Sequence, residues 1–257
     1  MVIEAAFAEH FRVMQDAAAR LPPVLAQVTD ELHACFARGN KLLACGNGGS
    51  ASDVEHLVAE LVGRNKDERR ARPAVALAGG MGTITAIAND YGYANVFARQ
   101  VEALAKPGDL LFAISTSGNS PNVLAAAESA RQRGVRVVGF TGASGGKLAT
   151  MVDVLISAPS TVTARIQEVH GFCIHVICEG LDRKLAAGDV VELPAGTAHR
   201  NLGAAPDLLV VGAYPQGCEP PDQLHGAPEE LARARHAVAA TPDPATDPVT
   251  GEAYPRR

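Results

Sequence analysis

The chain has 257 residues, of which 47% are apolar and 20% are charged, and its formal net charge is −5. This composition is typical of a globular protein with one domain and room for an appendage. The acidic balance argues against nucleic acid as a partner, and no apolar run is long enough for a membrane span or a signal peptide. The five cysteines include no CxxC pair, which favours reduced thiols, so we expect a cytoplasmic protein.

The first part of the chain predicts two helices and then an alternation of strands and helices. Apolar residues at helical spacing indicate the two helices within residues 1–38, separated at Pro22-Pro23. From Lys41 onwards short apolar runs alternate with helical patterns, and we expect strands at residues 41–45, 74–78, 109–114, 135–140 and 152–156. Continuously apolar strands of this kind predict a parallel sheet that is covered by helices on both faces.

A long helix is expected over residues 161–185, and the chain changes character after it. Its Ile, Val and Leu residues lie on more than one side, so we expect it to pack against a partner subunit as well as its own sheet. Beyond it, short apolar runs alternate with Pro/Gly turns and lead into a Pro-rich tail. We place a domain boundary near residue 186.

One turn between an expected strand and an expected helix carries four hydroxyl side chains, Ser115, Thr116, Ser117 and Ser120. Ser120 is placed as the N-cap of that helix, and Pro121 suits its first position. A helix start presents free N–H groups that favour a phosphate, which hydroxyls would hold here because the turn has no Lys or Arg. An ordinary polar loop with a good cap is the alternative.

A second, Gly-rich turn at residues 45–50 (Cys-Gly-Asn-Gly-Gly-Ser) follows the first expected strand. Ser50 and Asp53 have the spacing of a capping box, which predicts that a helix begins there. Two turns at the carboxyl ends of parallel strands would meet at the usual ligand crevice of such a sheet. A tight turn without a ligand is the alternative.

Ionisable residues at helical spacing follow these turns. His56 and Glu60 share one helix face, which suits a metal pair or a carboxylate base beside an imidazole, and equally a solvated face. The long helix carries a further group among apolar neighbours, namely Arg165, Gln167, Glu168, His170 and His175. A histidine in such surroundings is usually a hydrogen-bonded core residue.

Six segments follow one another along the chain: CGNGGS (45–50), HLVAELVGR (56–64), AIANDYGYANVF (86–97), ISTSGNS (114–120), TGASGGKLA (141–149) and ARIQEVHGFCIH (164–175). Together, and in this order, they resemble the phosphoheptose isomerases, single-domain members of the sugar-isomerase (SIS) superfamily. The resemblance covers roughly residues 1–186. It implies an α/β fold of the SIS type, with a five-stranded parallel sheet flanked by helices on both faces.

The resemblance also implies roles for individual residues. Glu60 and His175 would be the catalytic acid/base pair. The substrate would be bound by Asn47, Gly48, Gly49, Ser50, Glu60, Asn89, Asp90, Ser115, Thr116, Ser117, Ser120 and Gln167, with the phosphate at the four hydroxyl residues. One zinc ion per subunit would be bound by His56, Glu60, Gln167 and His175.

The implied reaction is an aldose–ketose isomerisation of sedoheptulose 7-phosphate to D-glycero-D-manno-heptose 7-phosphate, the first step of activated-heptose synthesis. It moves a proton between C1 and C2 through an enediol, which a carboxylate and an imidazole can catalyse, while zinc would polarise the carbonyl. Gln167 and His175 lie about 12 Å apart along a helix, so they converge from separate heights or come from different subunits. We expect a homo-oligomer, a tetramer, with active sites at subunit interfaces.

Two segments depart from the family's pattern. Residues 78–83 read Ala-Gly-Gly-Met-Gly-Thr where relatives often carry Asp with Ser or Thr near the substrate, and Ser144 stands where an acidic residue often precedes Gly-Gly-Lys. An isomerase of another phosphosugar therefore stays open. A non-catalytic phosphosugar-binding regulator is the second alternative, although such a protein has no need of Glu60 and His175.

The segment at residues 188–201 resembles the second conserved motif of cupins, G-x5-P-x-G-x2-H, with His199 at the position of a metal ligand. No upstream HxH…E motif accompanies it, and a lone ligand rarely makes a site, so metal binding at His199 is not expected. We expect residues 187–257 to form a small β-rich appendage that resembles half a cupin barrel, with a structural or oligomerising role or as a degenerate remnant.

Overall fold

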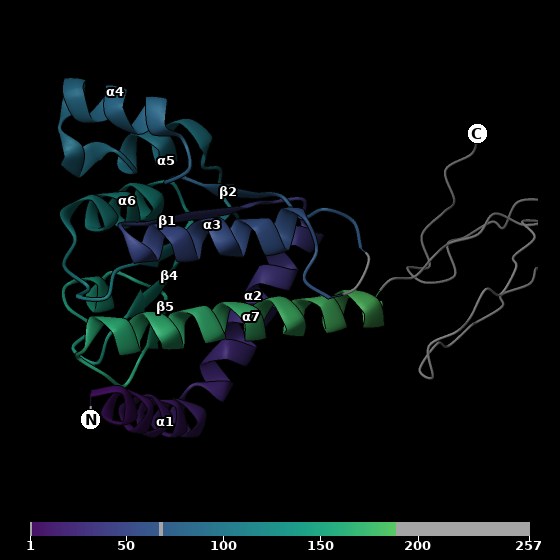
Figure 1. Cartoon of the computed structure of the whole chain (residues 1–257). Helices are drawn as coiled ribbons and strands as arrows, with labels where there is room; N and C mark the ends of the chain where they lie inside the picture. The colour runs from purple at the N-terminus through teal and green to yellow at the C-terminus, as the bar shows by residue number, and fades with distance from the viewer. Residues whose placement is uncertain (1, 67–68, 189–257) are drawn as a thin grey trace, which may run out of the picture. The chain divides into compact units, whose positions relative to one another are not determined.

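The computed structural model describes residues 2–66 and 69–188 (Figure 1). The chain divides into two units after Asp189, and all of the described residues belong to the first. Residues 187 and 188 continue the last helix. The rest of the cupin-like appendage, which was predicted for 187–257, lies outside the described residues.

Helices and strands alternate along the described chain, and each predicted strand is confirmed to within two residues. The order is α1 (Val2–Arg20), α2 (Pro22–Ala37), β1 (Leu42–Gly46), α3 (Gly49–Val62), β2 (Ala74–Ala76), α4 (Met81–Tyr91), the 3-10 helix η1 (Tyr93–Asn95), α5 (Ala98–Leu104), β3 (Leu110–Ile114), α6 (Pro121–Gln132), β4 (Arg136–Thr141), the 3-10 helix η2 (Leu148–Thr150), β5 (Val154–Ser157) and α7 (Thr163–Gly188).

The five strands form one parallel sheet, as predicted, and the structure gives their order as β2-β1-β3-β4-β5. The chain builds one side of the sheet from β1 to β2 and then crosses to β3 on the other side. The strand order therefore reverses between β1 and β3, where Gly46 pairs with Ile114. The two predicted ligand turns begin directly after these paired residues, at the position where parallel sheets bind ligands.

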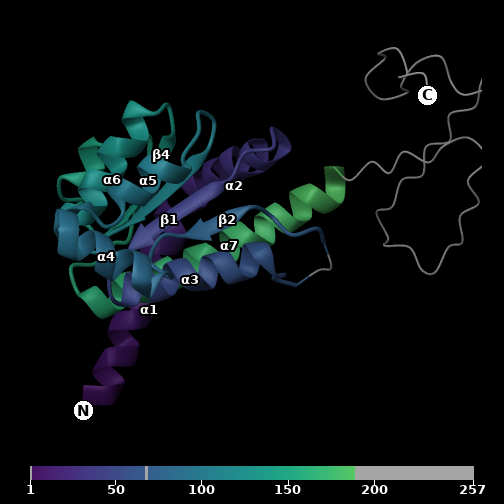
Figure 2. The ribbon, with the colours of Figure 1, turned by 90° about the horizontal axis from the view of Figure 1, so that it is seen from above.

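Helices cover both faces of the sheet (Figures 1 and 2). Alternate residues of each strand point to opposite faces, so Leu42 and Phe112 pack with α1, α2, α3 and α7, while Leu43 and Leu111 pack with α5 and α6. The cysteines Cys35, Cys45, Cys173 and Cys178 are buried free thiols, which confirms the predicted reduced thiols for these four positions.

Helix α7 packs against α1, α2 and α3 of its own chain, and this packing accounts for much of its two-sided apolar character. Apolar side chains nevertheless stay exposed on two neighbouring helices: Phe172 of α7 is 52% exposed, and Phe7 and Phe11 of α1 are 60% and 61% exposed. Packing against a partner subunit remains a prediction. Within the described ranges, no helix is both long and apolar enough to cross a membrane.

Candidate active site

The hydroxyl-rich turn links β3 to α6, with Ser120 as the N-cap residue and Pro121 as the first helical residue. The Ser120 hydroxyl does not cap a backbone N–H of the helix, as its position had suggested, but lies 3.0 Å from Ser115 Oγ. Ser115 Oγ is also 3.5 Å from Ser117 Oγ. Three hydroxyls therefore gather at the N-terminus of α6, where the helix dipole favours an anion.

The loop after β4 supports this turn from one side. Gly118 has a φ of +64°, and a Cβ atom at this position would lie 2.0 Å from the carbonyl oxygen of Gly145. The Lys147 N–H donates to Asn119 Oδ1 at 3.0 Å, and the Leu148 N–H donates to the Gly118 carbonyl at 2.9 Å. The two loops are thus in direct contact, and only glycine fits at the closest point.

A hollow of about 270 Å³ lies beside the turn and contains no charged side chain. It is lined by Thr116, Ser117, Asn119, Gly142, Ser144, Ser160, Thr161, Thr163 and Ile166. Sequence reasoning gave no role to Ser160, Thr161 and Thr163, which follow β5 and open α7.

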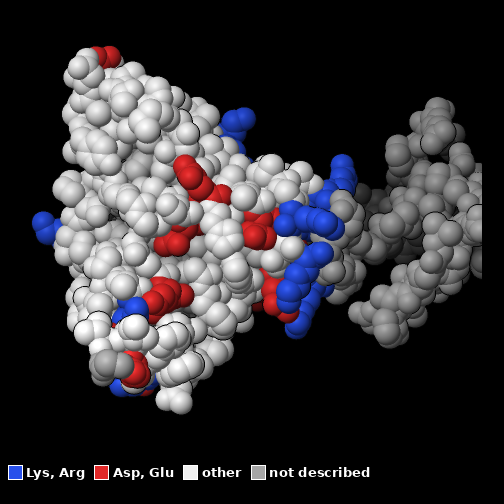
Figure 3. Space-filling model, in the orientation of Figure 1, with Lys and Arg blue, Asp and Glu red and all other residues white. Residues whose placement is uncertain are grey.

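On the face in Figure 3, basic side chains gather where α3 and α7 end, opposite the end at which the Gly-rich turn opens α3.

The Gly-rich turn opens α3, but the predicted capping box is wrong. The N-cap residue is Gly48, with φ +56° and ψ −123°, a conformation that glycine adopts without the strain of a side chain. Helix α3 therefore begins at Gly49, and Ser50 is already its second residue and 4% exposed. The special backbone of the turn, rather than a side-chain cap, starts this helix.

Asn47 joins the two turns. Its Nδ2 donates to Asn122 Oδ1 at 2.9 Å, and Asn122 Nδ2 donates back to Asn47 Oδ1 at 2.8 Å. The Tyr93 hydroxyl also donates to Asn47 Oδ1, at 3.1 Å. Asn122, which is 2% exposed, and Tyr93 were both missed by sequence reasoning. The available signal for Asn122 was a polar residue directly after Pro121, in the first turn of a helix that follows a ligand-type turn.

His56, Glu60 and His175 form one cluster between α3 and α7. His56 Nε2 lies 3.2 Å from Glu60 Oε1 and 3.0 Å from His175 Nε2. The ligand atoms of the three side chains all lie within 4.8 Å of one another. His56 and Glu60 are half-buried and His175 is exposed, so the cluster is open to a substrate. The structure thus brings together both proposed catalytic residues and three of the four proposed metal ligands.

The fourth proposed ligand, Gln167, lies apart from this cluster. Its Nε2 atom is 2.3 Å from the place where a Cβ on Gly49 would be, so it packs against the first residue of α3. Gly49 and His56 are seven residues, or about 10 Å, apart along that helix. Gln167 and His175 thus both contact α3 of their own chain, at separate heights.

The two proposed sugar contacts Asn89 and Asp90 lie near the end of α4 and are exposed. Asn89 Nδ2 donates to Asp90 Oδ1 at 2.8 Å, which fixes the two side chains relative to each other. Segment 78–83, which differs from the pattern common in the family, includes the first residues of the same helix, and its Met81 is 76% exposed. This helix has no buried residue, so most of its surface is available to a ligand or a neighbour.

The remaining ionisable residues of α7 have structural partners. His170 is fully buried, with Nε2 3.1 Å from the Thr141 carbonyl, and burial lowers its pKa to about 4. The prediction of a hydrogen-bonded core histidine is confirmed for His170, whereas it is wrong for His175, which is exposed. Arg165 Nη1 donates to the Ala6 carbonyl of α1 at 2.7 Å, and Arg165 Nη2 donates to Glu168 Oε1 at 2.5 Å.

Comparisons with known proteins identify the family to which the chain belongs. The SIS domain family matches residues 7–142. Over 190 residues the chain is 49% identical to the phosphoheptose isomerase of Shewanella sp. (strain ANA-3), a match that covers 73% of this chain and 96% of that protein. The chain belongs to the phosphoheptose isomerase family.

Two solved structures of phosphoheptose isomerases have the same fold. The protein from Neisseria gonorrhoeae is 43% identical with a TM-score of 0.67, and the match covers 70% of this chain and 97% of that one. The protein from Francisella tularensis is 38% identical with a TM-score of 0.69, covering 70% and 96%. The SIS-type sheet expected from the resemblance is therefore confirmed for this phosphoheptose isomerase family member.

Proposed function

We propose that the protein is an aldose–ketose isomerase that converts sedoheptulose 7-phosphate to D-glycero-D-manno-heptose 7-phosphate, the first step of activated-heptose synthesis. The observation that carries this proposal is the His56–Glu60–His175 cluster, in a chain that also holds a hydroxyl-lined helix N-terminus. A protein that only binds a phosphosugar needs the second feature but not the first. The kinship with phosphoheptose isomerases supports the choice of substrate.

In this proposal the hydroxyl turn binds the phosphate group. The Ser115 hydroxyl already lies within hydrogen-bond range of Ser117 Oγ and of Ser120 Oγ, and Thr116 lines the adjacent uncharged hollow. Hydroxyls and helix N–H groups can surround a phosphate without a basic side chain. The remaining residues that the family resemblance assigns to the substrate, Asn47 to Ser50, Asn89, Asp90 and Gln167, would then bind the sugar hydroxyls.

The other end of the sugar would react at the cluster. The carboxylate of Glu60 takes the proton from the carbon next to the carbonyl and returns it to the neighbouring carbon, so that the enediol forms and collapses. The imidazole of His175 moves protons between the two oxygens. A positioned acid and base of this kind typically accelerate proton transfer about 10²- to 10⁴-fold.

The donor set of the cluster fits zinc. Two imidazole nitrogens and a carboxylate oxygen, with all three atoms within 4.8 Å of one another, are ligand types that zinc accepts in proteins. We propose one zinc ion per subunit on His56, Glu60 and His175, with Gln167 as a fourth ligand if its side chain moves toward them. When bound, zinc supplies polarisation of the substrate carbonyl.

We further propose a homotetramer with active sites at subunit interfaces, working in the cytoplasm. The exposed aromatic side chains of α1 and the outer face of α4, a helix without a buried residue, are the surfaces that support an assembly. The buried free thiols fit a reducing compartment. Segment 78–83 (Ala-Gly-Gly-Met-Gly-Thr) lacks the Asp that relatives often carry there, and this keeps an isomerase of a different phosphosugar as the second candidate.

The test is to incubate the purified full chain with sedoheptulose 7-phosphate, with and without added zinc, and to follow aldose formation by NMR. Fructose 6-phosphate serves as the competing ketose phosphate, and calorimetry measures binding of both. We expect turnover of the heptulose. Binding without turnover would favour a phosphosugar-binding regulator. Faster turnover of fructose 6-phosphate would favour an isomerase of a different phosphosugar. The absence of both binding and turnover would refute the proposed isomerase and the regulator alike.

A further inference from the structure

A second link between α3 and α7 lies two helical turns beyond the cluster. Arg69 follows α3 in the chain, and its side chain is 5% exposed. Asp182 of α7 has a side chain that is 3% exposed and accepts a hydrogen bond from Arg69 Nε at 2.5 Å. This buried ion pair therefore joins the segment after α3 to the helix that carries His175.

The other side of the Arg69 guanidinium closes the C-terminus of α3. The last four carbonyls of a helix have no partner within the helix. Here Arg69 Nη2 donates to the Glu60 carbonyl at 2.6 Å, and Arg69 Nη1 donates to the Leu61 carbonyl at 2.9 Å. The positive charge also interacts favourably with this end of the helix dipole. The backbone of the proposed base is thus held directly by Arg69.

The pair is not the arrangement that stability alone would favour. Asp182 Oδ2 is buried without a hydrogen-bond partner among the described residues. Half-satisfied buried carboxylates are costly, and apolar replacements of buried ion pairs are often as stable or more stable. The ion pair by itself is therefore a weak source of stability, and the contacts that Arg69 makes with the backbone of α3 point to a positioning role.

We propose that Arg69 and Asp182 are positioning residues that set Glu60 against His175. Asp182 lies seven residues, or about two turns, after His175 on the same helix. The chain of contacts runs from the Glu60 carbonyl through Arg69 and Asp182 to α7, so both halves of the proton-transfer pair are fixed to one ion pair. This inference rests on the proposed isomerase function, because it concerns the rate of that reaction.

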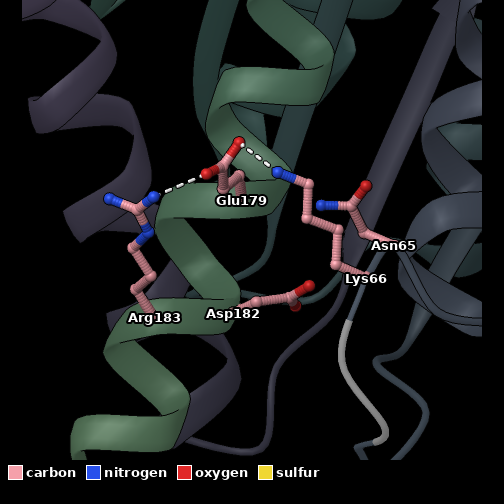
Figure 4. Close-up of a pocket in the computed structure, with 5 residues that line it drawn as sticks. All are labelled: Asn65, Lys66, Glu179, Asp182 and Arg183. Atoms are coloured by element: carbon pink, nitrogen blue, oxygen red, sulfur yellow. Dashed lines mark hydrogen bonds and ion pairs between the residues drawn. The ribbon is translucent and has the colours of Figure 1, made fainter.

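A neighbouring ion-pair group on the same helix provides the control (Figure 4). Glu179 Oε2 lies 3.1 Å from Lys66 Nζ, and Glu179 Oε1 lies 2.6 Å from Arg183 Nη2. With Asn65 and Asp182 these side chains line a surface hollow of about 190 Å³. The partners of Glu179 are exposed and, among the described residues, make no hydrogen bond to a backbone carbonyl of α3, and exposed pairs contribute little to stability.

The decisive variant is Arg69→Met/Asp182→Leu, which removes both charges and leaves the Glu60 carbonyl without its donor. We expect it to fold with a moderately lower melting temperature, because the apolar side chains replace the ion pair at little cost while the Glu60 carbonyl loses its donor. Its kcat for sedoheptulose 7-phosphate should fall about ten- to a hundredfold, because small displacements of reacting groups have effects of this size. Its KM should stay within about threefold, since the phosphate site on α6 is untouched. Glu179→Gln should keep the wild-type kcat.

Arg69→Lys is the second variant, because it keeps a charge for Asp182 but lacks the planar fork that reaches two carbonyls. We expect an intermediate loss of kcat, and this variant decides the matter if the double variant does not fold. A folded variant with wild-type kcat, or one in which only KM rises, would overturn the inference alone. An inactive wild type would instead overturn the proposed function and this inference with it.

Discussion

His56 lies between the two proposed catalytic side chains, and one atom, its Nε2, contacts both of them. At 3.0 Å from His175 Nε2 and 3.2 Å from Glu60 Oε1, this single nitrogen can donate only one hydrogen bond when neutral. A cation held by all three side chains would satisfy the group completely. The local chemistry at this residue therefore favours a metal ion.

We predict that zinc stabilises the wild-type chain through this group. At a free concentration of about 100 times Kd, the gain is about 2.7 kcal/mol, seen as a higher melting temperature that a chelator reverses. His56→Gln should lose most of this gain, whereas His33→Gln on α2, outside the cluster, should keep it. An equal gain in His56→Gln and the wild type would contradict the assignment of these ligands.

His170 makes a prediction about pH. Burial lowers its pKa from 6.5 to about 4, so the unfolded chain binds the proton more readily than the folded one. Its contribution to the free energy of unfolding is complete above about pH 6.5 and falls away toward pH 4, by about 3 kcal/mol in all. In urea titrations between these pH values, His170→Gln should show a clearly shallower loss of stability. A wild-type slope in this variant would show that other groups cause the acid sensitivity.

At the scale of the elements, the apolar pattern of the sequence was sufficient to predict the strands of the sheet but not the residue at which helix α3 begins. Continuous apolar runs located all five strands, because buried parallel strands differ sharply from the amphipathic helices between them. The start of α3 was placed wrongly because the backbone of Gly48, which no spacing rule reveals, begins the helix before Ser50 can cap it. The Asn47–Asn122 pair was missed because it joins residues 75 positions apart.

Two glycines give opposite predictions at this scale. Gly118→Ala forces a Cβ into the Gly145 carbonyl at a positive φ, so we expect lower stability and a raised KM as the hydroxyl turn separates from its supporting loop. Gly171→Ala, in the interior of α7 with open space around it, should stabilise the chain by about 1 kcal/mol. Thermal unfolding and steady-state kinetics of both variants check this, and equal effects would show that the contact between the loops is unimportant.

At the scale of the whole molecule, the exposed aromatic pair on α1 is the feature that a single chain leaves unexplained. Phe7 and Phe11 have ring centroids 6.4 Å apart, and each is about 60% exposed. Large exposed apolar groups that lie together usually mark an interface. The position of α1 against α7, which carries His175, connects such an interface to the site.

We predict that native mass measurement finds a tetramer for the wild type. Phe7→Ser/Phe11→Ser should shift the mass to smaller species and lower the activity, because the sites lose their neighbour. Leu104→Ser, which changes a 39% exposed side chain of α5, should leave both unchanged. A fully active monomer, of the wild type or of Phe7→Ser/Phe11→Ser, would contradict an active site at a subunit interface.

The central claim, that Glu60 carries out the proton transfer, is tested most directly by the kcat of Glu60→Gln for sedoheptulose 7-phosphate. The substitution keeps the shape of the side chain, and Glu128→Gln on the exposed face of α6 is the matched control. We predict that kcat falls about 10²- to 10⁴-fold with KM nearly unchanged, since the phosphate is bound elsewhere. A kcat within about twofold of the wild type would contradict the assignment of Glu60 as the base.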